Sequence, residues 1–375
     1  MQEPFQPGAR PAAPDSPSGE EAAAIRVLPV LRVRWIVEFT KCSLKCPYCI
    51  VEWTKRPLDF NPVRYNKILD RLLQQPNRLV IRLGVNGEIF LSPELQEGVI
   101  RLSHHPKVEG VSFSTNLIAS DKHVAAMLDR ADVTKLGMGC TLHDTQLTDE
   151  QIEGFFRRVK MVQERGVLIF VGYVAKPDRF EHMKRYKERL DAMGVPFISN
   201  EYNGAIEHVP YPAAYTPAQR EELREYLWAD HYYDMLVERK SPRGRLCTAG
   251  HQYVYINNDG DMFACGMERN LPWTVWQKLA RRVSKDWPAK MQRRRVSRRS
   301  LGNILEKDVP LSDRPSVCPH DSCTCGIEAQ AFYQVGKDYH RTRTLRVIYP
   351  KARAAEYEAR YPNLRPIEND SGDVK

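Results

Sequence analysis

The sequence lacks any long hydrophobic run. No stretch of eighteen consecutive apolar residues occurs in its 375 residues, whereas a membrane-spanning helix needs about 20. The opening stretch, MQEPFQPGARPAAPDSPSGEEAAA, also lacks the apolar core of a secretory signal. Its five prolines among scattered Gly, Ser and Ala predict a disordered lead-in over residues 1–30. We therefore expect no membrane association and a cytoplasmic location.

Cysteine is nearly absent outside two groups. In a chain without an export signal, clustered cysteines bind metal or do redox chemistry more often than they form a disulfide framework. Only Cys140 stands apart from the groups. The first group lies in KCSLKCPYC, and the second is spread over the C-terminal part. The members are Cys42, Cys46 and Cys49, then Cys247, Cys265, Cys318, Cys323 and Cys325.

Charge is close to balanced except in one stretch. Residues 281–299 hold nine Lys or Arg against one Asp, which is most of the net charge of +9. This stretch is either a solvated surface segment or a contact for an anionic partner, such as a phosphorylated substrate, RNA or an acidic peptide. No aromatic residues are interleaved in the manner of known RNA-binding signatures, so nucleic acid is not favoured as the partner.

Strand-like and helix-like segments alternate over residues 32–203. This alternation predicts a parallel sheet with helical crossovers, either an open doubly wound sheet or a partial barrel. In both folds the chemistry belongs at the carboxyl ends of the strands, and the three-cysteine loop directly follows the first strand. The predicted strands are 33–39, 78–84, 110–115, 133–142, 167–174 and 195–202, and the helices between them are about 62–73, 93–102, 121–131, 149–162 and 180–194.

The alternation ends after Tyr202. Residues 217–238 have the pattern of one helix, and residues 253–265 that of a β-hairpin turning at Asn258, Asp259 and Gly260. We therefore predict a second, smaller region that carries five of the nine cysteines. The expected division is residues 31–240, 241–335 and a C-terminal extension over 336–375.

The three thiolates of the first group are one ligand short of a closed zinc site. A C-x3-C-x2-C loop suits three corners of a [4Fe–4S] cube whose fourth iron stays open. A zinc knuckle that lacks its last ligand and a catalytic zinc with an open position are the alternatives. With Tyr48 as the aromatic residue of C-x3-C-x-aromatic-C, the chain resembles the radical S-adenosylmethionine (radical SAM) superfamily.

The resemblance implies a partial (β/α)6, TIM-like barrel of the α/β class. It implies that the open iron is chelated by SAM, which a reduced flavodoxin or ferredoxin helps to cleave. A 5′-deoxyadenosyl radical then abstracts a hydrogen from the substrate. By the same resemblance, the turn at Asn86, Gly87 and Glu88 receives the SAM ammonium group, although Asn86 replaces the usual glycine. Further SAM-facing or substrate-facing positions are Ser114, Thr115, Asn116 and His143.

The second cysteine group resembles the auxiliary-cluster appendage of SPASM and twitch radical SAM enzymes. Its opening is C-x12-G-x4-C from Cys247 through Gly260 to Cys265. Five cysteines suffice for one auxiliary [4Fe–4S] cluster, so the twitch arrangement is expected. Cys247 and Cys265 are the firmest ligands, Cys318 and Cys325 are favoured, and Cys323 remains a candidate. A zinc site on the same residues is the alternative.

The resemblance favours a carbohydrate-like small molecule as the substrate, such as a sugar, aminocyclitol or nucleotide-sugar, undergoing oxidation or epimerisation. Only about 30 residues precede the first strand, where many peptide-modifying relatives carry a leader-binding domain. Cys140, near the end of the fourth strand, is either a hydrogen-atom donor inside the barrel or a small buried hydrophobe. The alternatives are a maturase of a ribosomally made peptide and a zinc-dependent nucleic-acid binder.

Overall fold

A computed structural model describes most of the two predicted regions. The described residues are 30–49, 60–226, 233–234, 236–244, 246–269, 300–312, 316–321, 323, 339–341 and 348–350. Predictions for the lead-in up to residue 29, the basic stretch 281–299, Cys325 and residues 351–375 lie outside them. None of the helices in the described ranges is long and apolar enough to cross a membrane.

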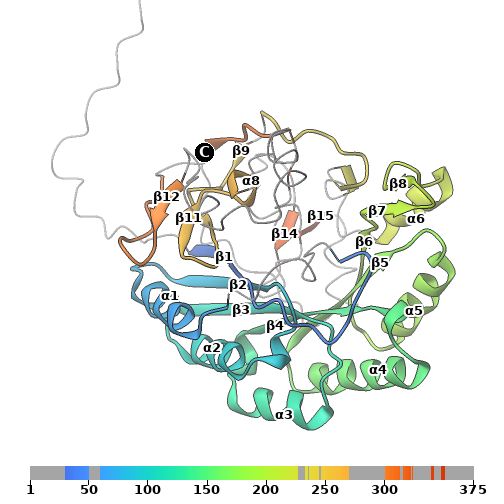
Figure 1. Cartoon of the computed structure of the whole chain (residues 1–375), viewed down its shortest axis with the longest axis horizontal. Coiled ribbons are helices and arrows are strands. Elements are labelled where there is room, and N and C mark those ends of the chain that lie inside the picture. Colours follow the sequence, from blue (N-terminus) through green and yellow to red (C-terminus); the bar gives the residue numbers. More distant parts are fainter. Residues whose placement is uncertain are drawn as a thin grey trace, which may run out of the picture.

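Six parallel strands in sequential order form the centre of the molecule (Figure 1). Each strand pairs with the next one along the chain. The strands are β1 (Leu31–Val37), β2 (Leu79–Val85), β3 (Val108–Thr115), β4 (Leu136–Leu142), β5 (Leu168–Ala175) and β6 (Phe197–Glu201). The crossover helices are α1 (Pro62–Gln74), α2 (Pro93–His104), α3 (Asp121–Arg130), α4 (Asp149–Glu164) and α5 (Phe180–Ala192).

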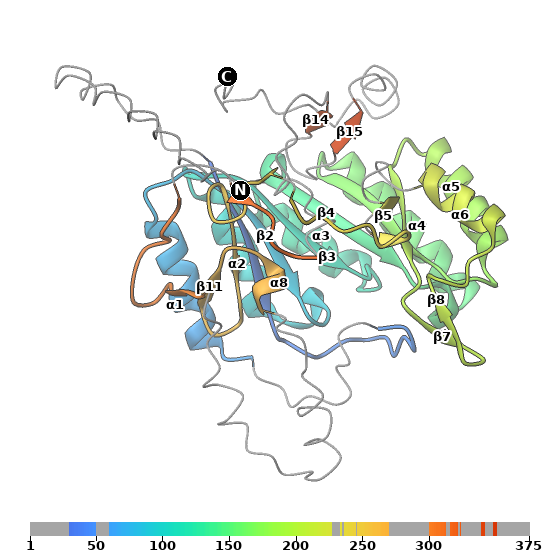
Figure 2. The same ribbon diagram turned by 90° about the horizontal axis from the view of Figure 1, so that it is seen from above.

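All five crossover helices cover the same face of the curved sheet, as Figures 1 and 2 show. A doubly wound sheet would carry helices on both faces and would reverse its strand order. Trp35 marks the covered face, because its ring stacks on Tyr65 of α1 with the centroids 4.7 Å apart. Leu83 of β2 pairs with Trp35, and Phe113 of β3 pairs with Leu83, so both side chains lie on that face. The partial (β/α)6 barrel is therefore confirmed and the open doubly wound sheet is excluded.

The opposite, concave face of the first strands is polar. Side chains alternate between the two faces of a strand, so Arg32, Arg34 and Arg82 point away from the helices. Arg34 and Arg82 are direct register partners. Arg82 also donates to Ser114 Oγ at 2.7 Å, which draws its guanidinium toward the carboxyl ends of the strands.

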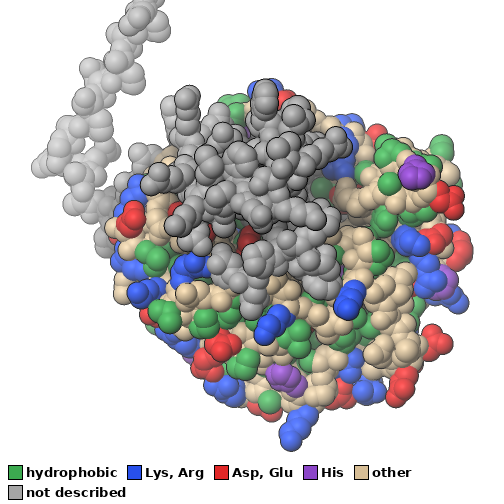
Figure 3. All heavy atoms as spheres, in the orientation of Figure 1, with side chains coloured by type: hydrophobic (Ala, Val, Ile, Leu, Met, Phe, Trp, Pro, Cys, Tyr) green, Lys and Arg blue, Asp and Glu red, His purple; other side chains and the backbone are tan. Residues whose placement is uncertain are grey.

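Local sequence signals set the helix starts. Ser92 caps α2 by accepting from Leu95 N, and Thr148 with Gln151 forms the predicted capping box of α4. Neighbouring helices are then joined in order by arginine–carboxylate pairs on the outer surface, where each pair contributes little alone. The pairs are Arg101–Asp70, Arg130–Glu97, Arg157–Asp121 and Arg189–Glu153. In Figure 3, charges of both signs are accordingly interspersed around the described surface.

The predicted hairpin is confirmed, and it extends the barrel sheet. Strands β10 (Tyr253–Ile256) and β11 (Asp261–Phe263) pair antiparallel, with Gly260 in the turn at φ +88°. Strand β10 also runs parallel to β1, and β12 (Ser300–Asn303) pairs with β11. The full order is β12-β11-β10-β1-β2-β3-β4-β5-β6. The domain division at residues 240 and 335 stays a prediction.

Shorter elements complete the described chain. One sequence prediction needs correction here: residues 133–135 form a 3-10 turn ahead of β4, since Asp132 caps it. Of the predicted helix 217–238, residues 217–226 are helical as α6, and residues 227–232 lie outside the described ranges. The other elements are the 3-10 turns η3 (Ile89–Leu91), η4 (Val133–Lys135) and η5 (Asp144–Gln146), helices α6 (Pro217–Tyr226) and α8 (Gly266–Arg269), and strands β7 (Gly204–Ile206), β8 (Val209–Tyr211), β9 (Leu246–Cys247), β13 (Ser316–Val317), β14 (Tyr339–Arg341) and β15 (Ile348–Pro350).

Candidate metal and cofactor sites

The three-cysteine loop leaves β1 at the carboxyl edge of the sheet. All three thiols are half-buried. The loop is folded on itself, because Cys49 N donates to Cys46 O at 3.1 Å and Leu44 N approaches Cys42 Sγ at 3.5 Å. The Leu44 side chain is buried beneath it. The thiols are thus presented at the predicted edge of the barrel.

The turn after β2 is hydrogen-bonded to the start of this loop. Thr40 N donates to Asn86 O at 2.6 Å, and Glu88 N donates to Lys41 O at 2.8 Å. Gly87 between them has φ +142°, and a Cβ there would lie 2.5 Å from Lys41 O. Only glycine fits this contact. The turn at Asn86, Gly87 and Glu88 therefore supports the start of the three-cysteine loop.

The Glu88 carboxylate joins the ends of β2 and β3. It is 2% exposed and accepts from Thr115 Oγ1 at 2.6 Å, Asn116 N at 2.7 Å and Phe90 N at 3.2 Å. Burial raises the pKa of this carboxyl, and the three donors act against that rise. Its predicted contact with the SAM ammonium group stays a prediction.

Asn116 connects the third strand to the cysteine loop. Its Nδ2 lies 3.7 Å from Cys42 Sγ and donates to Ser43 Oγ at 3.1 Å. Ser114 lies on the concave face with Arg82, while Thr115 lies on the helix-covered face with Glu88. The predicted triplet at the end of β3 is therefore divided between the two faces of the sheet, and Asn116 alone reaches the thiols.

Tyr48 and His143, predicted from separate motifs, are brought together. Tyr48 Oη lies 3.1 Å from His143 Nδ1, and the two rings stack with centroids 5.8 Å apart. Burial lowers the pKa of His143 to about 4, opposed by the neighbouring Asp144, and burial raises the pKa of Tyr48. Both side chains are therefore neutral near pH 7.

The electrostatics of the loop disfavour three thiolates that have no cation beside them. Burial raises the pKa of Cys46 to about 11, and the charges of Cys42 and Cys49 raise it further. Burial likewise raises the pKa of Cys42. Three thiolates at such spacing repel one another unless a cation lies among them, and iron–sulfur clusters are held by thiolates.

The second group of cysteines converges on one buried apolar cluster. Cys247, Cys265 and Cys318 pack there with four side chains that include Ile36 of β1, and the half-buried Cys323 packs against the cluster. Four of the five predicted ligands therefore lie near one another, and Cys325 lies outside the described residues. Buried thiols in an apolar surrounding fit a metal–sulfur centre, since thiolate is the ligand that soft metals select.

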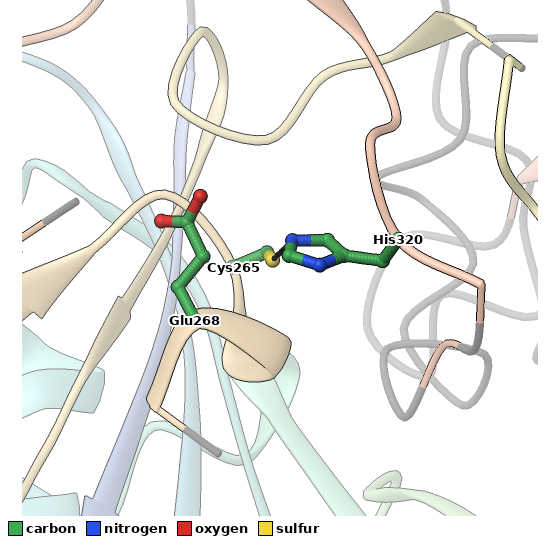
Figure 4. A group of neighbouring side chains, drawn as sticks. All are labelled: Cys265, Glu268 and His320. Atoms are coloured by element: carbon green, nitrogen blue, oxygen red, sulfur yellow. Dashed lines mark hydrogen bonds between the residues drawn. The ribbon is translucent and has the colours of Figure 1, made fainter. Parts of the chain in front are cut away.

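The structure also places His320 and Glu268 beside Cys265 (Figure 4). Sequence reasoning missed both residues. The signal was present in CPHDSC, where a histidine stands between two candidate cysteine ligands. It also missed Asp144, a buried carboxylate that accepts from Tyr173 Oη at 3.1 Å and from Arg179 at 2.6 Å next to His143.

Cys140 does not lie inside the barrel. It is register partner to Thr115 and Val171, and Met138, two residues earlier, pairs with Phe113 on the helix-covered face. The thiol is fully buried in the main apolar core, and burial raises its pKa well above the usual value. The hypothesis of a hydrogen-atom donor on the concave face is therefore wrong in its placement, and Cys140 is a small buried hydrophobe.

Comparisons with known proteins find similarity at the level of structure. No family model matches the chain, and no curated protein matches it. SuiB of Streptococcus suis bound to S-adenosylmethionine is 14% identical, with a TM-score of 0.49, over 76% of this chain and 65% of SuiB. anSMEcpe with bound AdoMet is 15% identical, with a TM-score of 0.47, over 74% of this chain and 79% of that one.

BtrN in complex with AdoMet and 2-DOIA is 11% identical, with a TM-score of 0.33, over 75% of this chain and 81% of BtrN. The chain spans less than two thirds of the length of SuiB. All of these TM-scores lie below 0.5, so the similarities assign no activity. In its cysteine loop and in its barrel, the chain resembles the radical SAM superfamily.

Proposed function

We propose that the chain is a radical SAM enzyme. The observation that carries the proposal is the loop of Cys42, Cys46 and Cys49, which offers three ligands from eight residues and is hydrogen-bonded at its start to the turn around Gly87. Three thiolates leave one iron of a [4Fe–4S] cluster open. When bound, the cluster and SAM supply a 5′-deoxyadenosyl radical that abstracts a hydrogen from the substrate.

The chain's own residues bind and orient these groups. Cys42, Cys46 and Cys49 would hold the cluster, and Asn116 fixes the Cys42 side of the loop through its amide. Tyr48 and His143 would offer a neutral stacking surface to the nucleoside. Glu88 holds the ends of β2 and β3 together beneath the site. A reduced flavodoxin or ferredoxin would deliver the electron.

For the substrate we propose a carbohydrate-like small molecule with an anionic group, such as a nucleotide-sugar. The polar concave face supports this, because Arg34 and Arg82 lie side by side there below the cysteine loop. Paired guanidinium groups suit phosphate or carboxylate oxygens. With Cys140 on the other face, oxidation is favoured over an epimerisation that needs a thiol donor.

For the C-terminal group we propose one auxiliary iron–sulfur cluster. The convergence of Cys247, Cys265 and Cys318 in one buried cluster supports it. Oxidation of a substrate radical needs an acceptor for one electron, and we assign that role to this centre. Cytoplasmic location, where such clusters and thiols are kept reduced, accords with the proposal.

The test is anaerobic purification followed by incubation with SAM and a reductant. We expect about 8 irons per chain, the content of two four-iron clusters, and release of 5′-deoxyadenosine. Zinc without iron would end the proposal. Transfer of deuterium from a labelled nucleotide-sugar into 5′-deoxyadenosine would identify the substrate class. Transfer from a labelled peptide instead would replace it with the peptide-maturase alternative.

A further inference from the structure

Three ligand-type side chains of different chemistry meet at the C-terminal centre (Figure 4). The Cys265 thiol, a Glu268 carboxylate oxygen and a His320 ring nitrogen all lie within 4.8 Å of one another. Cys265 follows β11, and Glu268 is one helical turn further on in α8. His320 follows β13, so it comes from a separate part of the chain.

The position of His320 is fixed on both sides. Two residues before it, Cys318 O accepts from Gly244 N at 2.9 Å. One residue after it, Asp321 accepts two hydrogen bonds from Arg243, at 2.6 and 2.7 Å. Strand β13 itself pairs with β9, opposite Cys247. The loop that carries His320 is therefore anchored to the segment that carries the first cysteine of the group.

The imidazole is directed at a thiol that the metal centre is expected to use. His320 Nε2 lies 3.5 Å from Cys265 Sγ, and Cys265 belongs to the buried cluster of Cys247 and Cys318. Counting His320 with these three cysteines gives four soft or borderline ligands. Cys3His is an established ligand set for metal centres in proteins, and imidazole replaces thiolate on iron in some clusters, where it raises the reduction potential.

We infer that His320 is the fourth protein ligand of the auxiliary centre, and this inference rests on the centre proposed above. His320 then takes the place expected of Cys323 or Cys325. The centre is then held by Cys247, Cys265, Cys318 and His320. Glu268 is not a ligand of an iron–sulfur cluster in this assignment, because carboxylate oxygen suits harder ions. A variant that lacks the Glu268 carboxylate therefore tests which kind of metal is bound.

The test compares four variants of the full chain, purified anaerobically with their clusters: His320→Ala, His320→Cys, Cys323→Ala and Glu268→Gln. In the reduced wild type, pulsed electron paramagnetic resonance should detect a nitrogen coupled to one of the two clusters. His320→Ala should lose that coupling and about four irons. His320→Cys should keep the iron and lose the coupling, which also controls for folding. Cys323→Ala and Glu268→Gln should retain both signals.

The opposite pattern would overturn the assignment: no nitrogen coupling, with iron lost from Cys323→Ala and kept in His320→Ala. One zinc per chain that depends on both His320 and Glu268 would keep His320 as a ligand and replace the auxiliary cluster by a single ion. The radical SAM proposal is tested separately, since 5′-deoxyadenosine release depends on Cys42 and should persist in every variant of His320.

Discussion

The two cysteine groups are built in opposite ways. The first holds its three cysteines within eight consecutive residues, half-buried on a loop that two neighbouring strand ends support. The second gathers cysteines from β9, the end of β11 and the segment after β13, buried in an apolar cluster. A local loop can leave one metal position open to a cofactor, whereas a buried, dispersed set is suited to closing a centre off from solvent.

Removing a ligand from the first group should have the largest effect. Cys42→Ala takes away one of only three thiolates, so we expect release of 5′-deoxyadenosine to be abolished and the iron content to fall from about eight to about four per chain. Chromatography of the SAM reaction and iron analysis check this. Undiminished 5′-deoxyadenosine release would show that the loop is not the reactive centre.

The matching change in the second group should separate the two centres. Cys265→Ala should also remove about four irons, yet 5′-deoxyadenosine should still form while the substrate product is lost. The same two assays, applied side by side with Cys42→Ala, check this. If both variants lose SAM cleavage equally, the two groups do not act as separate centres.

The support of the first loop should be sensitive to a single methyl group. Gly166→Ala, at φ +82° with nothing within 4 Å, should cost about 1–2 kcal/mol through its backbone alone. Gly87→Ala adds the clash with Lys41 O, so it should cost about 1–3 kcal/mol more and reduce iron at the loop. Denaturant unfolding and iron analysis of the two variants measure the difference. Equal costs would mean that the close approach has no role.

The aromatic pair beside the loop should have a smaller effect. Tyr48→Phe keeps the stacked ring and loses the contact with His143 Nδ1, a loss of about 0.5–1.5 kcal/mol. SAM binding should weaken about two- to tenfold, measured by calorimetry on the reconstituted protein. Tyr202→Phe is the control, because that ring meets Tyr48 edge-on and should leave the affinity unchanged.

Lowering the pH should reveal the burial of His143 through the free energy of unfolding. The pKa of His143 falls from 6.5 to about 4 on folding, so the folded state binds fewer protons than the unfolded state between these values. Its contribution is present above pH 6.5 and is lost as the pH falls toward 4. His143→Gln should therefore lose less stability over that window, measured by unfolding at pH 7 and pH 4.5. An identical pH dependence would place the acid sensitivity elsewhere.

The barrel could be predicted because its signals are local. The apolar run of residues 167–174 predicts a buried strand, and Thr148 with Gln151 predicts a helix start. The position of Gly87 and Glu88 followed from the family resemblance, but the hydrogen bonds of Glu88 to Lys41 and Thr115 did not, since those depend on strand register. The face on which Cys140 lies was left open between two alternatives for the same reason, because one residue of register reverses the face.

The second site could be predicted only in part. The spacing from Cys247 through Gly260 to Cys265 indicated a hairpin, which is local. His320 and Glu268 reach Cys265 only after β13 pairs with β9 and after α8 begins. Nothing in the spacing of CPHDSC says that its histidine is directed at a thiol 55 residues earlier.

The pairing of β10 with β1 has a consequence for how the two proposed metal centres are arranged along the sheet. The first loop leaves the carboxyl end of β1, whereas Cys265 follows β11 back toward the level at which Tyr253 pairs with Arg32. From Arg32 to Val37 the strand rises roughly 17 Å. If both groups hold clusters as proposed, β1 is a rigid element between the level of Cys265 and the start of the three-cysteine loop. Arg34 and Arg82, which pair in register on the concave face, lie between these two levels.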